Sequence, residues 1–77
     1  MTRIISVKPL GGGWSLQSDA FDSEMMFLSG AKAEAAARRL ADTLAKTGES
    51  SEIRIFSRDG RLAGTVTKRA HKFALAG

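Results

Sequence analysis

AKAEAAARRLADTLAK, residues 31–46, forms the clearest element of the chain. Alanine and leucine are strong helix formers, and here they recur at helical spacing on one stripe, with charged residues over the remaining surface. Ser29 is placed to cap the first turn, and Gly48 can take the left-handed conformation that follows many helix ends. Because the inner stripe is mostly alanine, the segment predicts one amphipathic helix that lies close against a sheet.

Two strands are predicted ahead of this helix. Residues 2–7 are small or β-branched, and Pro9 ends the strand because it cannot donate a ladder hydrogen bond. The glycines 11–13 make a turn, and Trp14 opens an alternating segment that returns as far as Ser18. No lysine follows the glycines in P-loop spacing and no helix starts there, so a turn is favoured over a phosphate loop. Trp14 is expected to anchor the core.

The run Met25-Met26-Phe27-Leu28 fits either a third strand or an extended lead into the helix. Large apolar side chains on adjacent residues cannot all point to the same face of a strand. Either both faces are covered here, or part of the run lies at an interface. Residues 25–28, or the open face of the sheet, are therefore one candidate surface for protein interaction or homodimerisation.

A second hairpin is predicted after the helix. Residues 52–58 alternate, and Asp59-Gly60 is a strong hairpin signal that would pair Arg58 with Arg61 as a two-residue loop. This register separates an apolar face from an outer face. The apolar face holds Ile53, Ile55, Leu62, Gly64 and Val66. The outer face holds Arg54, Phe56, Arg58, Arg61, Ala63, Thr65, Thr67 and Arg69.

The positive charge of the chain is concentrated in this hairpin. Cations and anions balance over residues 1–50, so the whole net charge of +4 comes from residues 51–77. Guanidinium groups around one aromatic ring suit single-stranded nucleic acid, because cations bind phosphate and the ring stacks on bases. The predicted residues for binding nucleic acid or another polyanion are Arg54, Phe56, Arg58, Arg61 and Arg69. The alternative is a solvated or protein-binding face, on which arginine stems cover the phenylalanine.

Other function classes find little support in the sequence. The chain has no cysteine, which disfavours a disulfide framework or a cysteine-based zinc site and makes the cytoplasm the expected compartment. His71 is the one histidine, so no metal site is expected. No nucleophile with a partner base is evident, so we expect a non-enzymatic protein without catalytic residues or cofactor. No segment approaches the roughly 20 apolar residues of a membrane span, so no membrane partner is expected.

Length and pattern together predict one α+β domain. The 77 residues suit a single domain over 1–77, with residues 70–77 as a flexible tail. The expected architecture is a small antiparallel sheet with one helix packed on one face, in the order β-β-(β)-α-β-β. Such a sheet leaves its other face open to a partner.

Three features carry a resemblance to a known family. They are Trp14 on the second strand, Phe27-Leu28-Ser29 leading into Ala33-Glu34-Ala35-Ala36, and the turn Arg58-Asp59-Gly60-Arg61. Over about residues 4–68 the chain resembles short bacterial ββαββ proteins known only as a domain of unknown function, from which it departs by the inserted Met25-Met26. The resemblance implies the fold and a bacterial or phage-like origin, and it transfers neither activity nor site.

Overall fold

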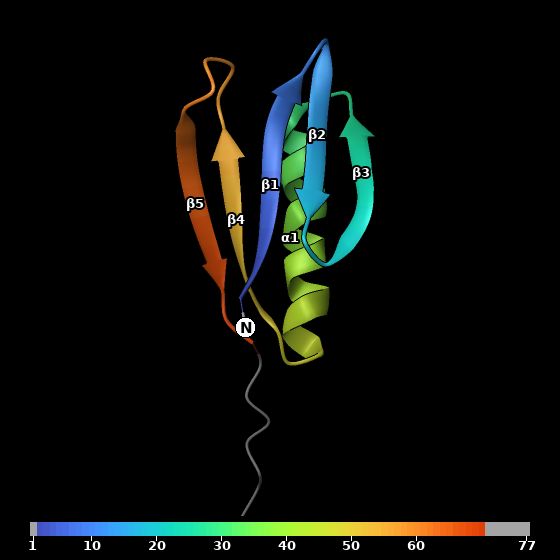
Figure 1. Ribbon diagram of the computed structural model, residues 1–77, viewed down its shortest axis with the longest axis vertical. Helices are drawn as coiled ribbons and strands as arrows, with labels where there is room; N and C mark the ends of the chain where they lie inside the picture. Colours follow the sequence, from blue (N-terminus) through green and yellow to red (C-terminus); the bar gives the residue numbers. More distant parts are fainter. Residues whose placement is uncertain (1, 71–77) are drawn as a thin grey trace, which may run out of the picture.

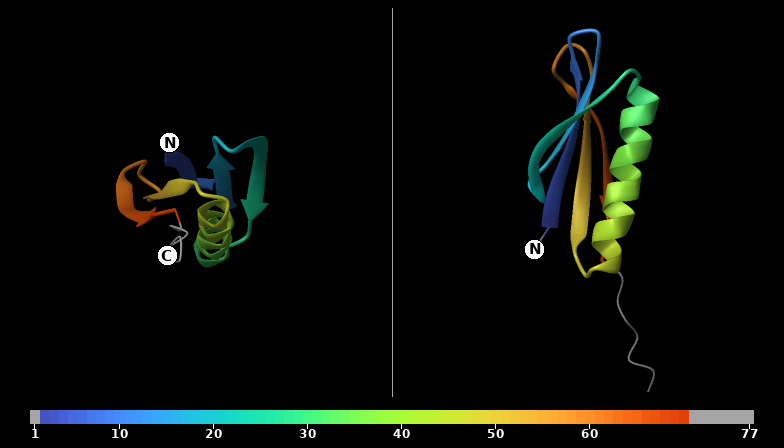
Figure 2. Two further views of the ribbon diagram at one scale, coloured as in Figure 1. Left: turned by 90° about the horizontal axis from the view of Figure 1, so that it is seen from below. Right: turned by 90° about the vertical axis from the view of Figure 1, so that its right-hand side faces the viewer.

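The computed structural model of the protein describes residues 2–70 and has two layers, a sheet and a helix (Figure 1). The helix covers one face of the sheet, and the opposite face is open (Figure 2). The elements are β1 (Thr2–Leu10), β2 (Gly13–Ser18), β3 (Phe21–Phe27), α1 (Gly30–Lys46), β4 (Ser50–Phe56) and β5 (Leu62–Lys68). The α+β class is confirmed, and the alternative for residues 25–28 is settled because Met25, Met26 and Phe27 belong to a third strand.

The predicted helix is confirmed together with both of its ends. Ser29 is extended, and its Oγ accepts a hydrogen bond from the backbone N–H of Lys32 at 3.2 Å. At the other end Gly48 has φ +90°, which a residue with a side chain rarely adopts. The N–H of Glu49 then donates to the carbonyl of Leu44 at 2.9 Å, so a carbonyl of the last turn keeps a partner.

The sheet is five-stranded and mixed, which corrects the small antiparallel sheet expected from sequence. Its strand order is β3-β2-β1-β4-β5. β1 and β4 pair in parallel, with Ile5 beside Ile53 and Val7 beside Ile55, whereas all other neighbours are antiparallel. α1 carries the chain back along the sheet after β3, so β4 enters beside β1 in the same direction. Each hairpin has local turn signals, but none specifies how the two hairpins join.

The core lies between α1 and the central strands. Its buried residues are Ile5, Val7, Leu16 and Ile53 from the sheet and Ala33, Ala37, Ala41, Leu44 and Ala45 from the helix. Trp14 packs against the edge of this cluster, in agreement with its predicted role as an anchor. Its indole lies against Gly30, where an added Cβ would stand 2.9 Å from Cε2 of the ring. The first helical residue is therefore glycine because the tryptophan needs the space.

The last hairpin follows the predicted register only in its strands. Ile53 pairs with Val66 and Ile55 with Gly64 as expected, but Phe56 pairs with Leu62 across a bulge. The loop is longer than two residues: the N–H of Gly60 donates to Ser57 O at 3.0 Å, and Gly60 has φ +83°. This is the type I turn with a left-handed glycine, which adds one residue to a two-residue loop.

The extra residue corrects two expectations about this hairpin. Leu62 lies beside Phe56 and is 53% exposed, although the predicted register placed it on the apolar face. Arg58 and Arg61 do not form a cross-strand pair, because both lie in the loop between β4 and β5.

Candidate nucleic-acid interface

The open face of the sheet is polar in its middle and carries apolar and cationic side chains at one end. Its middle is polar, since Ser6 lies beside Gln17 on one side and beside Arg54 on the other, and Arg54 lies beside Thr65. The end that carries the β1–β2 turn and the β4–β5 loop is called the loop end below, and it lies at the top of Figure 1. Apolar and cationic side chains gather there on the same face. They are Met26, Lys8, Phe56 and Leu62, with the buried Ser15 between Lys8 and Met26.

Lys8 and Phe56 form the centre of the loop end. The parallel pairing of Val7 with Ile55 brings the next residues of both strands side by side on the open face. The ammonium Nζ of Lys8 lies 5.3 Å from the centroid of the Phe56 ring, within the range of a cation–π contact. A cation and a half-buried aromatic ring thus share one small surface.

A pocket of about 260 Å³ opens at this place. Its lining combines two rings, two cations and polar loop groups. The lining residues are Lys8, Pro9, Phe56, Ser57, Arg58 and Gly60. Such a lining offers flat apolar surface to a base and positive charge to a phosphate.

The loop beside the pocket is held in shape by Asp59. Its carboxylate accepts hydrogen bonds from the Ser57 hydroxyl and, at 3.1 Å, from the backbone N–H of Arg61. These hydrogen bonds lower the pKa of Asp59 below its ordinary value. The hydrogen bond from Ser57 is the larger cause, and the one from Arg61 is the second. Asp59 is therefore ionised at neutral pH and fixes the loop through local hydrogen bonds.

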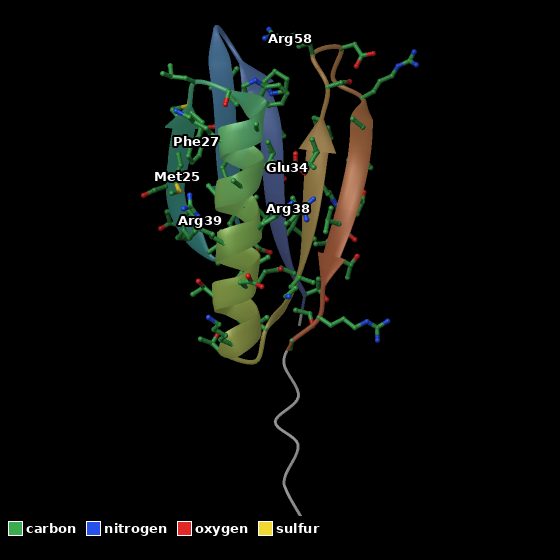
Figure 3. The ribbon with its side chains drawn as sticks, turned by 180° about the vertical axis from the view of Figure 1, so that it is seen from behind. Met25, Phe27, Glu34, Arg38, Arg39 and Arg58 are labelled. Atoms are coloured by element: carbon green, nitrogen blue, oxygen red, sulfur yellow. The ribbon has the colours of Figure 1, made fainter. Side chains whose placement is uncertain are left out.

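The two loop arginines differ in their charge environment. Arg61 Nε lies 3.7 Å from Asp59 Oδ2, so part of its charge is offset by a neighbour, although its side chain is 86% exposed. Arg58 is exposed and makes no ion pair with any other residue of the 2–70 range. Figure 3 shows it at the loop end, between the β4–β5 loop and the β1–β2 turn. Arg58 is thus the loop guanidinium whose charge no carboxylate of the described residues offsets.

The structure separates the remaining predicted residues from this cluster. Arg54 lies on the open face but in its polar middle, where Nε donates to the carboxylate of Glu52. Arg69 follows the last residue of β5, at the opposite end of the sheet, and lines a different hollow with Thr2 and Ser50. The length of β5 puts it roughly 20 Å or more from the loop. The five predicted residues therefore do not form one site: Phe56 and Arg58 come together, Arg61 is adjacent, and Arg54 and Arg69 are apart.

Sequence reasoning missed Lys8 and Pro9. Both belong to the first strand, and they reach Phe56 only because β1 and β4 are parallel neighbours. No local pattern predicts that pairing.

A second exposed surface lies at the other side of the sheet, on β3. Met25 is 43%, Met26 55% and Leu28 87% exposed, and Leu28 directly follows the strand. Figure 3 shows Met25 and Phe27 on the helix side of β3, whereas Met26 faces the other way because it pairs with Ser15. The end of β3 is thus apolar on both of its faces.

Within residues 2–70 no three acidic, histidine or cysteine side chains gather as a metal site, and no helix is long and apolar enough to cross a bilayer. Residues 71–77 of the predicted tail 70–77, which include His71, lie outside the described range. No family model, no curated protein and no solved structure matches this chain.

Proposed function

We propose that the chain is a non-enzymatic binding module that holds nucleic acid, or another polyanion of the same charge pattern, at the loop end of its open face. One observation carries the proposal: Lys8 and Arg58 flank the half-buried ring of Phe56 around a pocket of about 260 Å³. Neither cation is neutralised by a carboxylate of residues 2–70. Cations beside an aromatic ring can bind the phosphates on either side of a base that stacks on the ring.

The geometry favours single strands over duplex. A base must lie flat on the Phe56 ring to stack, and bases in a duplex are already stacked on each other. The Lys8 ammonium that lies near the ring is free to turn toward a phosphate, because its side chain is long and its contact with the ring is weak at an exposed site. Arg61 adds positive charge beside the pocket, and Asp59 offsets part of that charge.

The proposal extends to origin and location. The resemblance to short bacterial ββαββ proteins supports a bacterial or phage-like origin, and the lack of cysteine supports a cytoplasmic location. Neither bears on the chemistry of the loop end.

The experiment is a titration of ¹⁵N-labelled protein with short single-stranded and double-stranded oligonucleotides, at about 50 mM salt, where phosphate contacts are strong. We expect the largest amide shifts at Lys8 and across residues 56–61, reversed by added salt. The double variant K8A/R58A should bind more weakly to every sequence. The slope of log K against log salt should fall by about 1.4, since each phosphate contact on a single strand contributes about 0.7.

A matched control separates a site from general positive charge. The variant K32A/R39A removes the same charge from exposed residues of α1, which covers the other face of the sheet. It should leave both affinity and shifts nearly unchanged. F56L keeps an apolar side chain but removes the ring, and it should weaken binding by about 1 kcal/mol or more through lost stacking. Equal losses for both double variants, or no shifts at the loop end, would refute the proposal.

A second function of a different class is favoured by the exposed end of β3. Met25, Met26 and Leu28 are exposed large apolar side chains at and just after the end of β3. This surface supports a role in protein interaction or homodimerisation through residues 25–28, separate from the loop end.

A further inference from the structure

We infer that the chain forms a homodimer in which β3 pairs with β3 of a second copy, antiparallel, with Met26 on the two-fold axis. The inference rests on the second proposed function, the interaction surface of residues 25–28, and it is independent of nucleic-acid binding by Lys8, Phe56 and Arg58. It starts from the two edge strands, β3 and β5, since each has one neighbour in the sheet of residues 2–70. An edge strand presents unpaired backbone groups, and proteins protect such edges with charge, bulges or a cover.

The edge at β5 is protected. Its sequence is mostly polar, with Thr65, Thr67 and the charged Lys68, and a bulge displaces its start. These are the devices that discourage pairing with another strand. Leu62 is the one large exposed apolar residue of that edge, at 53%.

β3 is protected only in its first half. Asp22 and Glu24 lie there, opposite a register shift in β2 between Leu16 and Ser18. The second half has regular pairing with β2, no charge, and exposed Met25 and Met26. Figure 2 shows β3 reaching past α1, so the helix does not cover this edge. The unprotected half is therefore open to a strand from another molecule.

Symmetry restricts how two copies of β3 can pair. In one continuous sheet with a two-fold axis, residues directly opposite each other must lie on the same face. The residue numbers of every opposing pair must then add up to the same even number. The residue whose number is half of that sum lies on the axis, opposite its own copy. The candidates for that residue are Ser23, Glu24, Met25, Met26 and Phe27.

Charge and strand length select among these registers. With Ser23 or Glu24 at the axis, carboxylates of the two copies face each other across the strands, which is unfavourable. With Phe27 at the axis, most of the pairing falls beyond the end of β3. With Met25 at the axis, Glu24 faces the partner's Met26 and Ser23 faces the partner's Phe27.

The register with Met26 at the axis matches the apolar residues of β3 best, and it places Glu24 opposite the partner's Leu28, just beyond the end of β3. Met26 meets its own copy on the open face, and Met25 meets the partner's Phe27 twice on the helix face. The two Glu24 carboxylates are then four residues apart along the strands, about 13 Å. Leu28, which is 87% exposed, comes to lie against the partner's strand. A second copy of this chain is thus the occupant that the pattern of β3 fits.

Cysteine cross-linking tests the register directly, because the chain has no cysteine of its own. Residues directly opposite in an antiparallel pair have Cα atoms about 4.5–5.5 Å apart, which a disulfide can bridge. In a glutathione redox buffer we expect M26C to form a covalent dimer in high yield, and the neighbours E24C and M25C to form at most a small fraction of that yield. Equal yields at the three positions, or a monomeric M26C with an intact fold, would overturn the register.

The oligomeric state provides the second readout. Sedimentation of the unmodified protein should show a dimer fraction that rises with concentration. M26K places two ammonium groups opposite each other at the axis and should weaken the dimer about tenfold or more. L62K introduces the same charge at a residue of nearly equal exposure on the other edge, and should leave the dimer unchanged. A monomer at millimolar protein concentration, or a dimer weakened by L62K and not by M26K, would overturn the inference.

Discussion

Gly13 offers the sharpest test of how β2 and β3 fit together. A Cβ added at Gly13 would stand 2.6 Å from the carbonyl oxygen of Phe27. An ordinary close contact between carbon and oxygen is about 3.3 Å or longer, so the two strands would have to separate by roughly 0.7 Å at this point. The obstacle is backbone, which cannot turn aside as a side chain does. We therefore expect Gly13→Ala to destabilise the protein.

The magnitude follows from two opposing effects. Overpacking of this kind costs about 1–3 kcal/mol, whereas replacing glycine with alanine stabilises by about 0.4–1 kcal/mol through the unfolded chain. The net loss is about 1–2 kcal/mol, out of a total of roughly 4–12 kcal/mol for a 77-residue domain. At about 4–8 °C per kcal/mol, the melting temperature should fall by roughly 5–15 °C.

The assay is urea unfolding followed by the fluorescence of Trp14, the one tryptophan of the chain, and by far-UV circular dichroism. Gly12→Ala is the matched control. A Cβ at Gly12 meets nothing within 4 Å, and its backbone is outside the left-handed region, so this variant should be as stable as the natural chain or slightly more stable. Equal unfolding midpoints for the two alanine variants would refute the described contact between β2 and β3.

Three further predictions concern the loop and the helix. Gly60→Ala should lower stability by about 1–2 kcal/mol, because φ is +83° there, and a thermal melt measures the loss. Ser29→Ala should cost about 1 kcal/mol by removing the cap on the N–H of Lys32, with Ser29→Asp retaining most of the stability in the same melt. The carboxyl of Asp59 should titrate below 3.8 when followed by ¹³C NMR, and Ser57→Ala should raise its pKa toward that value. Because the folded pKa is lowered, the contribution of Asp59 to stability is present above the unfolded pKa and is lost as pH falls through the folded one. A value at or above 3.8 in the natural chain would contradict the hydrogen bonds assigned to this carboxylate.

The local elements of this fold were predictable because their signals are local. Ser29 and Gly48 mark the ends of α1, and the pairs Ile53 with Val66 and Ile55 with Gly64 follow from alternation. The loop of the last hairpin was not predicted. Asp59-Gly60 suits either of two turns that differ by one residue, and the observed turn is stabilised by the Asp59 carboxylate on the N–H of Arg61.

The candidate site was only half predictable. Phe56 and Arg58 are recognisable from the charge and alternation of one hairpin. Lys8 completes the cluster through the parallel pairing of β1 with β4, which is a property of the whole chain and leaves no mark in either strand. Arg54 and Arg69 share the predicted face with Phe56, but Arg69 lies a strand length away from the loop, and alternation does not show that Glu52 pairs with Arg54.

The central place of β1 also bears on the order in which the protein folds during synthesis. Ile5 is made before α1, yet its partner Ile53 belongs to a strand that emerges after α1 is complete. Until then β1 has an open apolar edge, and the alanine stripe of α1 lacks the strand that forms much of the surface beneath it. Closing so long a loop is slow compared with forming a helix or a hairpin. The nascent chain should therefore be cleaved readily by proteases and bound by chaperones until β4 has left the ribosome. It should then fold in one cooperative step.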